Sequence, residues 1–184
     1  MLVIVGASAS GKTQCARHLM EQYGYRKAIT TTTRPPRIDE QAGVDYHFVD
    51  APTFTLLEAQ NAFVETTTYH HHRYGLQKKD AHPHHIVIVD PNGANALHAA
   101  LGSQVTIVLI QSASHLRRAR MHKRGDETRA MEERLIQDDA LFAPERFTHI
   151  DAVLDNETQS METLAQKVDA FYRSHTHAQP PQKD

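Results

Sequence analysis

The chain is nearly free of cysteine, has no long apolar run, and carries almost balanced charges. Its 184 residues include one cysteine, Cys15, which excludes an intrachain disulfide and fits a reducing cytoplasm. The N-terminus lacks the features of a signal peptide, and no apolar segment approaches the roughly 20 residues that span a bilayer. The formal net charge of −2 argues against a globally basic surface. We therefore predict a cytoplasmic protein with no nucleic-acid or membrane partner.

Buried-strand patterns alternate with helical patterns along most of the chain. The strand candidates are short apolar runs, typical of parallel strands covered on both faces. They are residues 2–6, 85–90, 104–110 and 152–156. Helical periodicity occurs at residues 11–22, 94–101, 114–124, 129–142 and 160–173. This alternation predicts an α/β fold with a central parallel sheet.

Residues 28–79 differ from this pattern. They are rich in Thr, His, Tyr and Pro, and contain short polar–apolar alternation such as DYHFVD, with helical periodicity only near residues 53–61. We predict a small antiparallel insert here rather than another βαβ unit. The C-terminal segment SHTHAQPPQKD is polar, contains paired prolines, and is expected to be disordered.

The motif G-x-x-x-x-G-K-[ST] follows the first predicted strand directly. It reads GASASGKT at residues 6–13, and the strand before it and the helix after it are the context that this motif requires. Such a loop turns successive N–H groups inward, beside a helix N-terminus, to form a site for anions. Lys12 supplies a charge for the β- and γ-phosphates, and Thr13 offers a hydroxyl to Mg²⁺, the predicted cofactor. The predicted ATP contacts here are Gly6, Ala7, Ser8, Ala9, Ser10, Gly11, Lys12, Thr13 and Gln14.

Two arginines lie three positions apart around a Pro-Pro turn in TTTTRPPR, residues 30–37. Each presents a planar fork of donors, so Arg34 and Arg37 can converge on one phosphate group. If the segment stood alone, a surface loop with solvated arginines would be the better interpretation. Near a phosphate loop, a second anion site suits an enzyme that joins two phosphorylated molecules.

The segment TTRPPRIDEQAGVDYHFV resembles the guanylate kinase family, in which a phosphate loop is followed by TTRxPRxGExxGxDYxFV. Asp39 departs from the pattern, because the family usually has glycine there. Further similarities run along nearly the whole chain: FVE at 63–65, YG at 74–75, DPNG at 90–93, RMHKRG at 120–125, ERL at 133–135 and LDN at 154–156. The resemblance implies a P-loop kinase three-layer fold with a central parallel sheet, a small monophosphate-binding insert and a helical lid.

The resemblance also implies boundaries for these parts. The core P-loop domain would comprise residues 1–29, 80–118 and 143–175. The monophosphate-binding insert would comprise residues 30–79, and the lid residues 119–142. Residues 176–184 would form a disordered tail.

Carried over position by position, the resemblance implies an acceptor site for GMP. The matching residues are Thr30, Arg34, Arg37, Tyr46, Glu65, Tyr74, Gly75 and Asp90. The arginines and tyrosines would hold the phosphate, while Thr30 and Glu65 would read guanine. A carboxylate accepts hydrogen bonds from both N1–H and the 2-amino group of guanine, and adenine has neither donor. Without the surrounding similarities, an ordinary exposed acid at a strand end would be the simpler interpretation of Glu65.

The basic segment LRRARMHKRGDETRAMEERL corresponds to the family's lid. A solvated helix face is the usual explanation of such a run. Here its arginines match those that reach ATP phosphates and neutralise charge on the transferred phosphoryl group. The catalytic set implied by the resemblance is Lys12, Arg34, Arg120, Arg124 and Arg134. Lid closure would exclude water and prevent ATP hydrolysis. Outside the lid, Asn156 is a candidate adenine contact by resemblance only.

Two positions depart from the family pattern near the predicted acceptor site. Leu76 stands where the family has Ser or Thr, whose hydroxyl helps to bind guanine, and Ile88 replaces the first acid of D-x-D. One lost hydrogen bond is worth about 0.5–1.5 kcal/mol, so GMP binding would weaken without being abolished. The leading hypothesis is ATP-dependent phosphoryl transfer to GMP or dGMP.

Other interpretations stay open. One is a related kinase with another phosphorylated acceptor, such as ribose 1,5-bisphosphate. Another is a non-catalytic guanylate-kinase-like binding domain, although its expected mark, a degraded phosphate loop, is missing. A metal ion at residues 70–72, with His82, His84 and His85, would need a turn, because neighbouring strand residues point to opposite faces. We expect residues 70–72 to form a solvent-facing bend instead. For the oligomeric state, both a monomer and a homodimer are compatible with the sequence.

Overall fold

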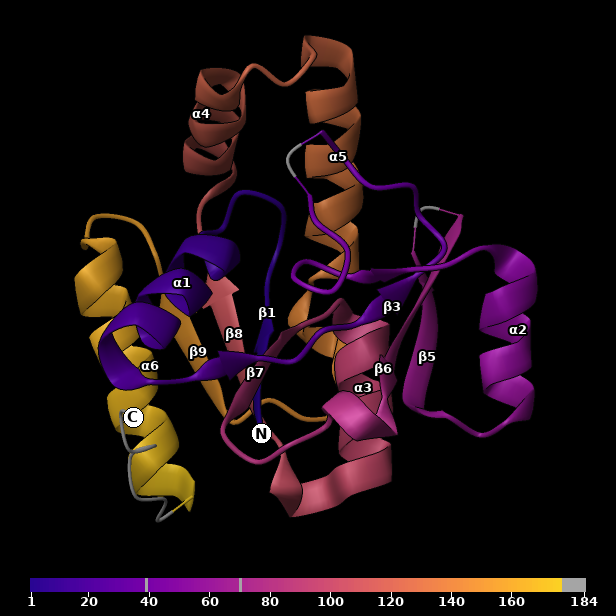
Figure 1. The fold of residues 1–184 in the computed structure, drawn as a ribbon. Coiled ribbons are helices and arrows are strands. Elements are labelled where there is room, and N and C mark those ends of the chain that lie inside the picture. Colours follow the sequence, from indigo (N-terminus) through magenta and orange to yellow (C-terminus); the bar gives the residue numbers. More distant parts are fainter. Residues whose placement is uncertain (39, 70, 177–184) are drawn as a thin grey trace.

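Two β-sheets organise the chain (Figure 1). The computed structural model describes residues 1–38, 40–69 and 71–176. The larger sheet is parallel throughout, with the order β2-β7-β1-β8-β9. Its strands are β1 (Leu2–Val5), β2 (Arg26–Lys27), β7 (His85–Ile88), β8 (Thr106–Gln111) and β9 (Ala152–Asp155). The predicted α/β fold with a parallel central sheet is confirmed; β2 was not predicted, because two residues are too few to form a pattern.

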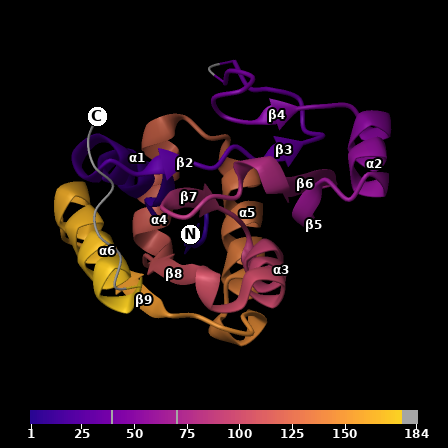
Figure 2. The same ribbon diagram turned by 60° about the horizontal axis from the view of Figure 1, so that its bottom comes forward.

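Helices cover both faces of the parallel sheet (Figure 2). Alternate residues of β1 explain why its sequence is apolar without a break. Leu2 and Ile4 pack in one core with α1 (Lys12–Tyr23) and α6 (Met161–Thr176), and Val3 and Val5 pack in a second core with α3 (Pro91–Leu101). A strand buried on both faces has no polar side to alternate with.

The helix predictions are confirmed with small shifts at the ends. α3 begins three residues before its predicted start, because the Asp90 carboxylate accepts a hydrogen bond from Gly93 N–H at 2.8 Å and caps the helix. α4 (Ser114–Arg124) has the predicted bounds, and α5 is Thr128–Leu141. α6 runs to Thr176, so the prediction of disorder is wrong for residues 174–176, which belong to this helix; residues 177–184 of the predicted tail lie outside the described part.

The predicted insert contains the second sheet and one helix. Its elements are β3 (Thr31–Thr32), β4 (His47–Phe48), α2 (Ala51–Ala59), β5 (Phe63–Tyr69) and β6 (His72–Gln77). β6 pairs with β3 and β5 in antiparallel fashion, but β3 and β4 are parallel, so the prediction of an antiparallel unit is wrong for that pair. Short 3₁₀ turns occur at Lys78–Asp80, Gly102–Gln104 and Pro144–Arg146.

The histidine run lies at the hairpin between β5 and β6. His71 is exposed with a φ of 66°, His72 begins β6, and His70 lies outside the described residues. Within the described ranges, no group of three or more His, Cys, Asp or Glu is arranged to hold a metal ion. No helix in those ranges is both long and apolar enough to cross a membrane.

Leu76 attaches the insert to the core of the parallel sheet. Its side chain is 0% exposed and packs in the same cluster as Val87 and Leu97. The residue that departs from the family pattern therefore has a packing role, and its side chain does not line the cavities described below.

Replacing Leu76 with serine is expected to lower the free energy of unfolding by about 3 kcal/mol, because it leaves a void and buries a hydroxyl. Chemical denaturation measures this change. Leu56→Ser is the matched control, because Leu56 is 57% exposed and should change stability by only about 0.5 kcal/mol. Equal stabilities of the two variants would contradict the packing role.

Candidate active site

The phosphate loop is the connection between β1 and α1. Gly6 has a φ of 150°, and a Cβ atom there would lie 2.3 Å from the backbone oxygen of Ile110, so only glycine fits. Inside the loop, Ser10 N–H donates to Ala7 O at 3.1 Å, and Lys12 Nζ donates to the same oxygen at 2.8 Å. Burial lowers the pKa of Lys12 to about 8, while the Asp138 carboxylate acts in the opposite direction.

Three side chains hold the outer side of this loop. Ser8 N–H donates to the Asp138 carboxylate at 2.6 Å, and the Arg120 guanidinium donates to Ala9 O at 3.0 Å. The Asn156 amide donates to Ser10 O at 2.7 Å. Consecutive residues of the loop are thus fixed from outside, which leaves its inner side for an anion.

A cavity of about 250 Å³ joins the phosphate loop to the insert. It brings together most of the residues predicted for the two substrates. Those lining it are Gly6, Ser8, Lys12, Thr13, Thr30, Arg34, Arg37, Tyr46, Glu65, Tyr74 and Asp90. Ile88 also lines this cavity. The cavity wall therefore has an apolar side chain at the position where the family pattern has the first acid of D-x-D.

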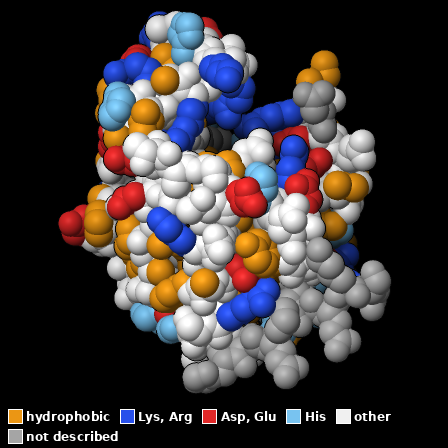
Figure 3. All heavy atoms as spheres, turned by 90° about the vertical axis from the view of Figure 1, so that its left-hand side faces the viewer, with side chains coloured by type: hydrophobic (Ala, Val, Ile, Leu, Met, Phe, Trp, Pro, Cys, Tyr) orange, Lys and Arg blue, Asp and Glu red, His pale blue; other side chains and the backbone are white. Residues whose placement is uncertain are grey.

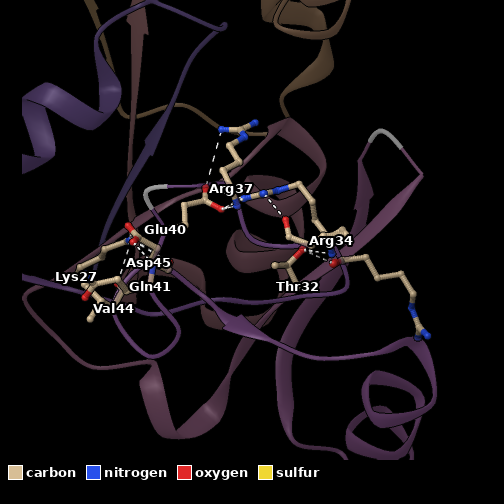
Figure 4. Close-up of polar contacts among 10 residues, drawn as sticks. Lys27, Thr32, Arg34, Arg37, Glu40, Gln41, Val44 and Asp45 are labelled. Carbon is tan, nitrogen blue, oxygen red and sulfur yellow. Dashed lines mark hydrogen bonds and ion pairs between the residues drawn. The ribbon is translucent and has the colours of Figure 1, made fainter.

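Glu40 holds the two arginines of the Pro-Pro turn together (Figure 4). Its carboxylate accepts two hydrogen bonds from Arg34 Nη2, at 2.8 and 2.9 Å, and one from Arg37 N–H at 2.8 Å. Burial raises the pKa of Glu40, but these hydrogen bonds outweigh it and leave the pKa below its ordinary value. The Arg34 guanidinium also lies 5.3 Å from the ring centre of Tyr46. Arg34 is therefore fixed, while the Arg37 side chain is 70% exposed and lies 4.0 Å from Glu40, a contact that a ligand phosphate can replace.

Glu65 is a buried carboxylate at the wall of the same cavity. It is 6% exposed, its Oε1 accepts a hydrogen bond from Leu76 N–H at 3.0 Å, and its Oε2 has no hydrogen-bond partner among the described residues. Burial raises the pKa of Glu65 to about 8, and the neighbouring charge of Asp90 adds to this rise. Burying a polar atom without a partner is unfavourable, so Oε2 indicates a position where a ligand donates.

A second cavity of about 530 Å³ lies between the phosphate loop and the two helices α4 and α5. Arg124 and Arg134 line it together with Lys12, Thr13 and Arg37. Basic residues from distant parts of the chain thus line one cavity, next to the loop that would hold the phosphates of a nucleotide. Figure 3 shows Lys and Arg side chains gathered at the level of α4.

Several predicted site residues lie elsewhere. Arg120 and Asn156 contact the outer side of the loop and line neither cavity, and Gln14 is an exposed residue of α1. Gly75 is required by packing, because a Cβ atom there would lie 2.8 Å from the Phe63 ring. The resemblance names these positions but does not say where their side chains point.

Other residues of the site were not predicted. Thr67 and Tyr69 line the smaller cavity on the same face of β5 as Glu65. The alternation of strand residues could have identified them, because positions 65, 67 and 69 share one face. Glu40 was within the family motif, but Asp138 was in no motif.

Thr13 is the residue that fits a Mg²⁺ ion. Its hydroxyl-bearing side chain lines both cavities beside Lys12. Since the described residues offer no group of three or more acidic, His or Cys ligands, protein atoms alone would not enclose the ion. This suits Mg²⁺ bound through one hydroxyl, nucleotide phosphates and water.

Comparisons with known proteins identify the family of the chain. The family model described as guanylate kinase matches residues 1–175. The guanylate kinase of Nitrosomonas europaea is 32% identical, over 73% of this chain and 71% of that relative. The guanylate kinase of Thermus thermophilus is also 32% identical, over 74% of this chain and 66% of that relative. The crystal structure of guanylate kinase from Anaplasma phagocytophilum has a TM-score of 0.69 and 21% identity, covering 96% of this chain and 86% of that one, and supports the fold. The chain belongs to the guanylate kinase family.

Proposed function

We propose that the protein catalyses ATP-dependent phosphorylation of GMP to GDP, with release of ADP. One observation carries this proposal: Lys12 and Thr13 of the phosphate loop share a single cavity with the Arg34–Arg37 pair and with Glu65. A donor phosphate site, an acceptor phosphate site and a base-reading carboxylate are thus neighbours. In a cell, the reaction would belong to purine nucleotide metabolism in the cytoplasm.

The acceptor would lie between the arginine turn and β5. Arg34 and Arg37 would hold its phosphate with Tyr46 and Tyr74, whose rings lie 6.2 Å apart along the same wall. The unpartnered Glu65 Oε2 and its neighbour Oε1 would accept from N1–H and the 2-amino group of guanine. A sugar bisphosphate has no such pair of donors, so the buried carboxylate favours GMP over ribose 1,5-bisphosphate.

The donor would lie on the inner side of the phosphate loop. Lys12 would move from Ala7 O to the phosphates, and Arg124 and Arg134 would approach from α4 and α5. A Mg²⁺ ion held at Thr13 would add positive charge beside the phosphates. No general base is needed, because the attacking phosphate oxygen of GMP is already ionised. Catalysis would then depend on alignment and on charge stabilisation.

The division into parts also remains a proposal. The core would be residues 1–29, 80–118 and 143–175, the insert residues 30–79, and the lid residues 119–142. Its support is the separate sheet of the insert and the pairing of α4 with α5 above the phosphate loop (Figure 1). Closure of the lid over ATP would exclude water.

A coupled ADP-release assay tests the activity. ADP release should require ATP, Mg²⁺ and GMP together, and ribose 1,5-bisphosphate should not replace GMP. ADP release that is independent of GMP, or faster with ribose 1,5-bisphosphate, would contradict the proposal.

The affinity for GMP should rise with pH up to about 8. Below its raised pKa of about 8, Glu65 is protonated, and it must lose that proton before it can accept from guanine. The Kd of GMP should therefore fall by up to about tenfold per pH unit between pH 6.5 and 8, and then level off. Titration calorimetry without ATP measures this; because Lys12 lines the same cavity and its pKa is also about 8, the effect of Glu65 is read from the difference from a variant without its carboxylate. Glu65→Gln is the control, and an equal pH slope in that variant would contradict the role of Glu65.

A further inference from the structure

Asp138 is a buried acid of α5 that no sequence motif includes. Its side chain is 1% exposed, although it lies on α5, the helix that contributes Arg134 to the second cavity. Its Oδ2 accepts a hydrogen bond from Ser8 N–H at 2.6 Å, and its Oδ1 accepts from Tyr69 OH at 3.4 Å. Arg117 of α4 lies 3.9 Å from Oδ2. One carboxylate thus contacts the phosphate loop, the insert and the helix that precedes α5.

We propose that Asp138 is a positioning residue for phosphoryl transfer, which fixes the phosphate loop from the side of α5 and connects it to the acceptor cavity. The proposal rests on the function proposed above, because the phosphate loop and the acceptor cavity need a fixed relative placement only if a phosphoryl group is transferred between them. Asp138 itself does not contact the reacting atoms.

The conformation of the loop explains why an outer anchor is needed. Ala9 has a φ of 59°, a left-handed conformation that is unfavourable for a residue with a Cβ atom. The bond from Arg120 to Ala9 O holds the peptide group that follows this Cα atom, and the hydrogen bond from Ser8 N–H to Asp138 holds the Ala7–Ser8 peptide, one peptide group further back on the other side. The bond from Ser8 N–H to Asp138 is short, at 2.6 Å, and Asp138 is 1% exposed, so water does not compete for it. Without it, the loop can relax away from the shape that presents its N–H groups to the phosphates.

Tyr69 extends this connection to the acceptor. It lines the smaller cavity together with Glu65 and Thr67, on the same face of β5. A carboxylate that contacts both Ser8 and Tyr69 therefore links the wall of the acceptor cavity to the loop that holds the donor. In-line transfer depends on the relative placement of the two substrates, and a small misplacement slows it strongly.

Removing Asp138 alone would leave the buried Arg117 with one carboxylate partner fewer. Arg117 is 2% exposed, and besides Asp138 it pairs with Asp139, Ser114 and Ser112 O. Loss of one partner of a buried ion pair destabilises a protein, whereas replacing both by apolar residues is often tolerated. The test variant is therefore Arg117→Leu/Asp138→Ala. Asp139→Asn is the matched control, because it removes the neighbouring acid, whose side chain is 55% exposed, without changing the contact to Ser8.

Two measurements test the proposal. Arg117→Leu/Asp138→Ala should lower kcat with GMP and ATP by about tenfold and change each KM by less than about twofold, whereas Asp139→Asn should keep the wild-type kcat. Hydrogen exchange without substrates should be faster in the loop, residues 6–13, of the double variant and unchanged in the control. A wild-type kcat, or wild-type exchange of the loop, in the folded double variant would overturn the proposal.

A second variant and a measurement that needs no substrate complete the test. If the double variant does not fold, Arg117→Met/Asp138→Leu, which fills more of the same space and also leaves no acceptor for Ser8 N–H, is measured in the same way and judged by the same outcomes. The exchange experiment needs no substrate, so it reports on the anchor even if the proposed acceptor is wrong. Absence of GMP-dependent turnover in the wild-type protein would instead contradict the proposed function.

Discussion

Replacing Lys12 with methionine is expected to lower kcat for phosphoryl transfer by about 1,000-fold. Lys12 is the cation at the bottom of the phosphate loop, and its Nζ donates to Ala7 O at 2.8 Å, with no other hydrogen bond among the contacts described. It is free to reach the phosphates, where charge develops as the phosphoryl group leaves ADP. Methionine keeps much of the side-chain length but carries no charge. Steady-state kinetics with saturating ATP and GMP measure the loss.

The control for this variant is Lys167→Met. Lys167 is an exposed residue of α6, and its Nζ donates to Gln159, far from both cavities in sequence and in the fold. Its replacement should leave kcat unchanged. A Lys12→Met variant that remains folded and retains more than about a tenth of the wild-type kcat would contradict the role of the loop in catalysis.

Replacing Glu65 with glutamine is expected to lower kcat/KM for GMP by about 100-fold, which corresponds to about 2.7 kcal/mol. The amide of glutamine turns one acceptor into a donor, and this donor would oppose N1–H or the 2-amino group of guanine. Because Glu65 is 6% exposed, water cannot restore the missing interaction. Activity with AMP should fall far less, since adenine offers no donor pair to either side chain.

Glu162→Gln is the control for this change, because Glu162 is exposed in the first turn of α6. It should leave kcat/KM for both substrates unchanged. An equal loss with GMP and AMP in the Glu65→Gln variant would indicate that Glu65 acts on folding or on the phosphate, and not on the base.

The parallel sheet and its helices could be predicted from the sequence because their signals are local. The apolar run of β1 and the glycine-rich turn after it lie within one short segment. Alternate residues of β1 pack in the cores on the two faces of the sheet, so every residue of the run is apolar. The two-residue strands β2, β3 and β4 carry no such signal, since their pairing depends on partners distant in the chain. The parallel pairing of β3 with β4 was missed for this reason.

The site was predictable only as a set of positions. The family resemblance assigned Arg34, Arg37 and Glu65 to the same acceptor site, and in the structure all three line one cavity. The motif could not show that Arg120 and Asn156 turn toward the outside of the phosphate loop, because side-chain direction is set by tertiary contacts.

Two further residues show the limits of motif reading. Asp138 has its main partner, Ser8, 130 positions away, so no spacing in the sequence could reveal the contact. Leu76 was interpreted as a lost hydrogen bond, but its side chain fills the core, while its N–H orients Glu65.

The central claim is that the cavity reads guanine on a monophosphate and transfers a phosphoryl group to it. The most direct test is a substrate panel of kcat/KM values for GMP, dGMP, IMP and AMP with saturating ATP and Mg²⁺. GMP and dGMP should exceed AMP by about 100-fold or more, and IMP, which keeps N1–H but lacks the 2-amino group, should lie between them. Equal values for AMP and GMP would contradict the claim.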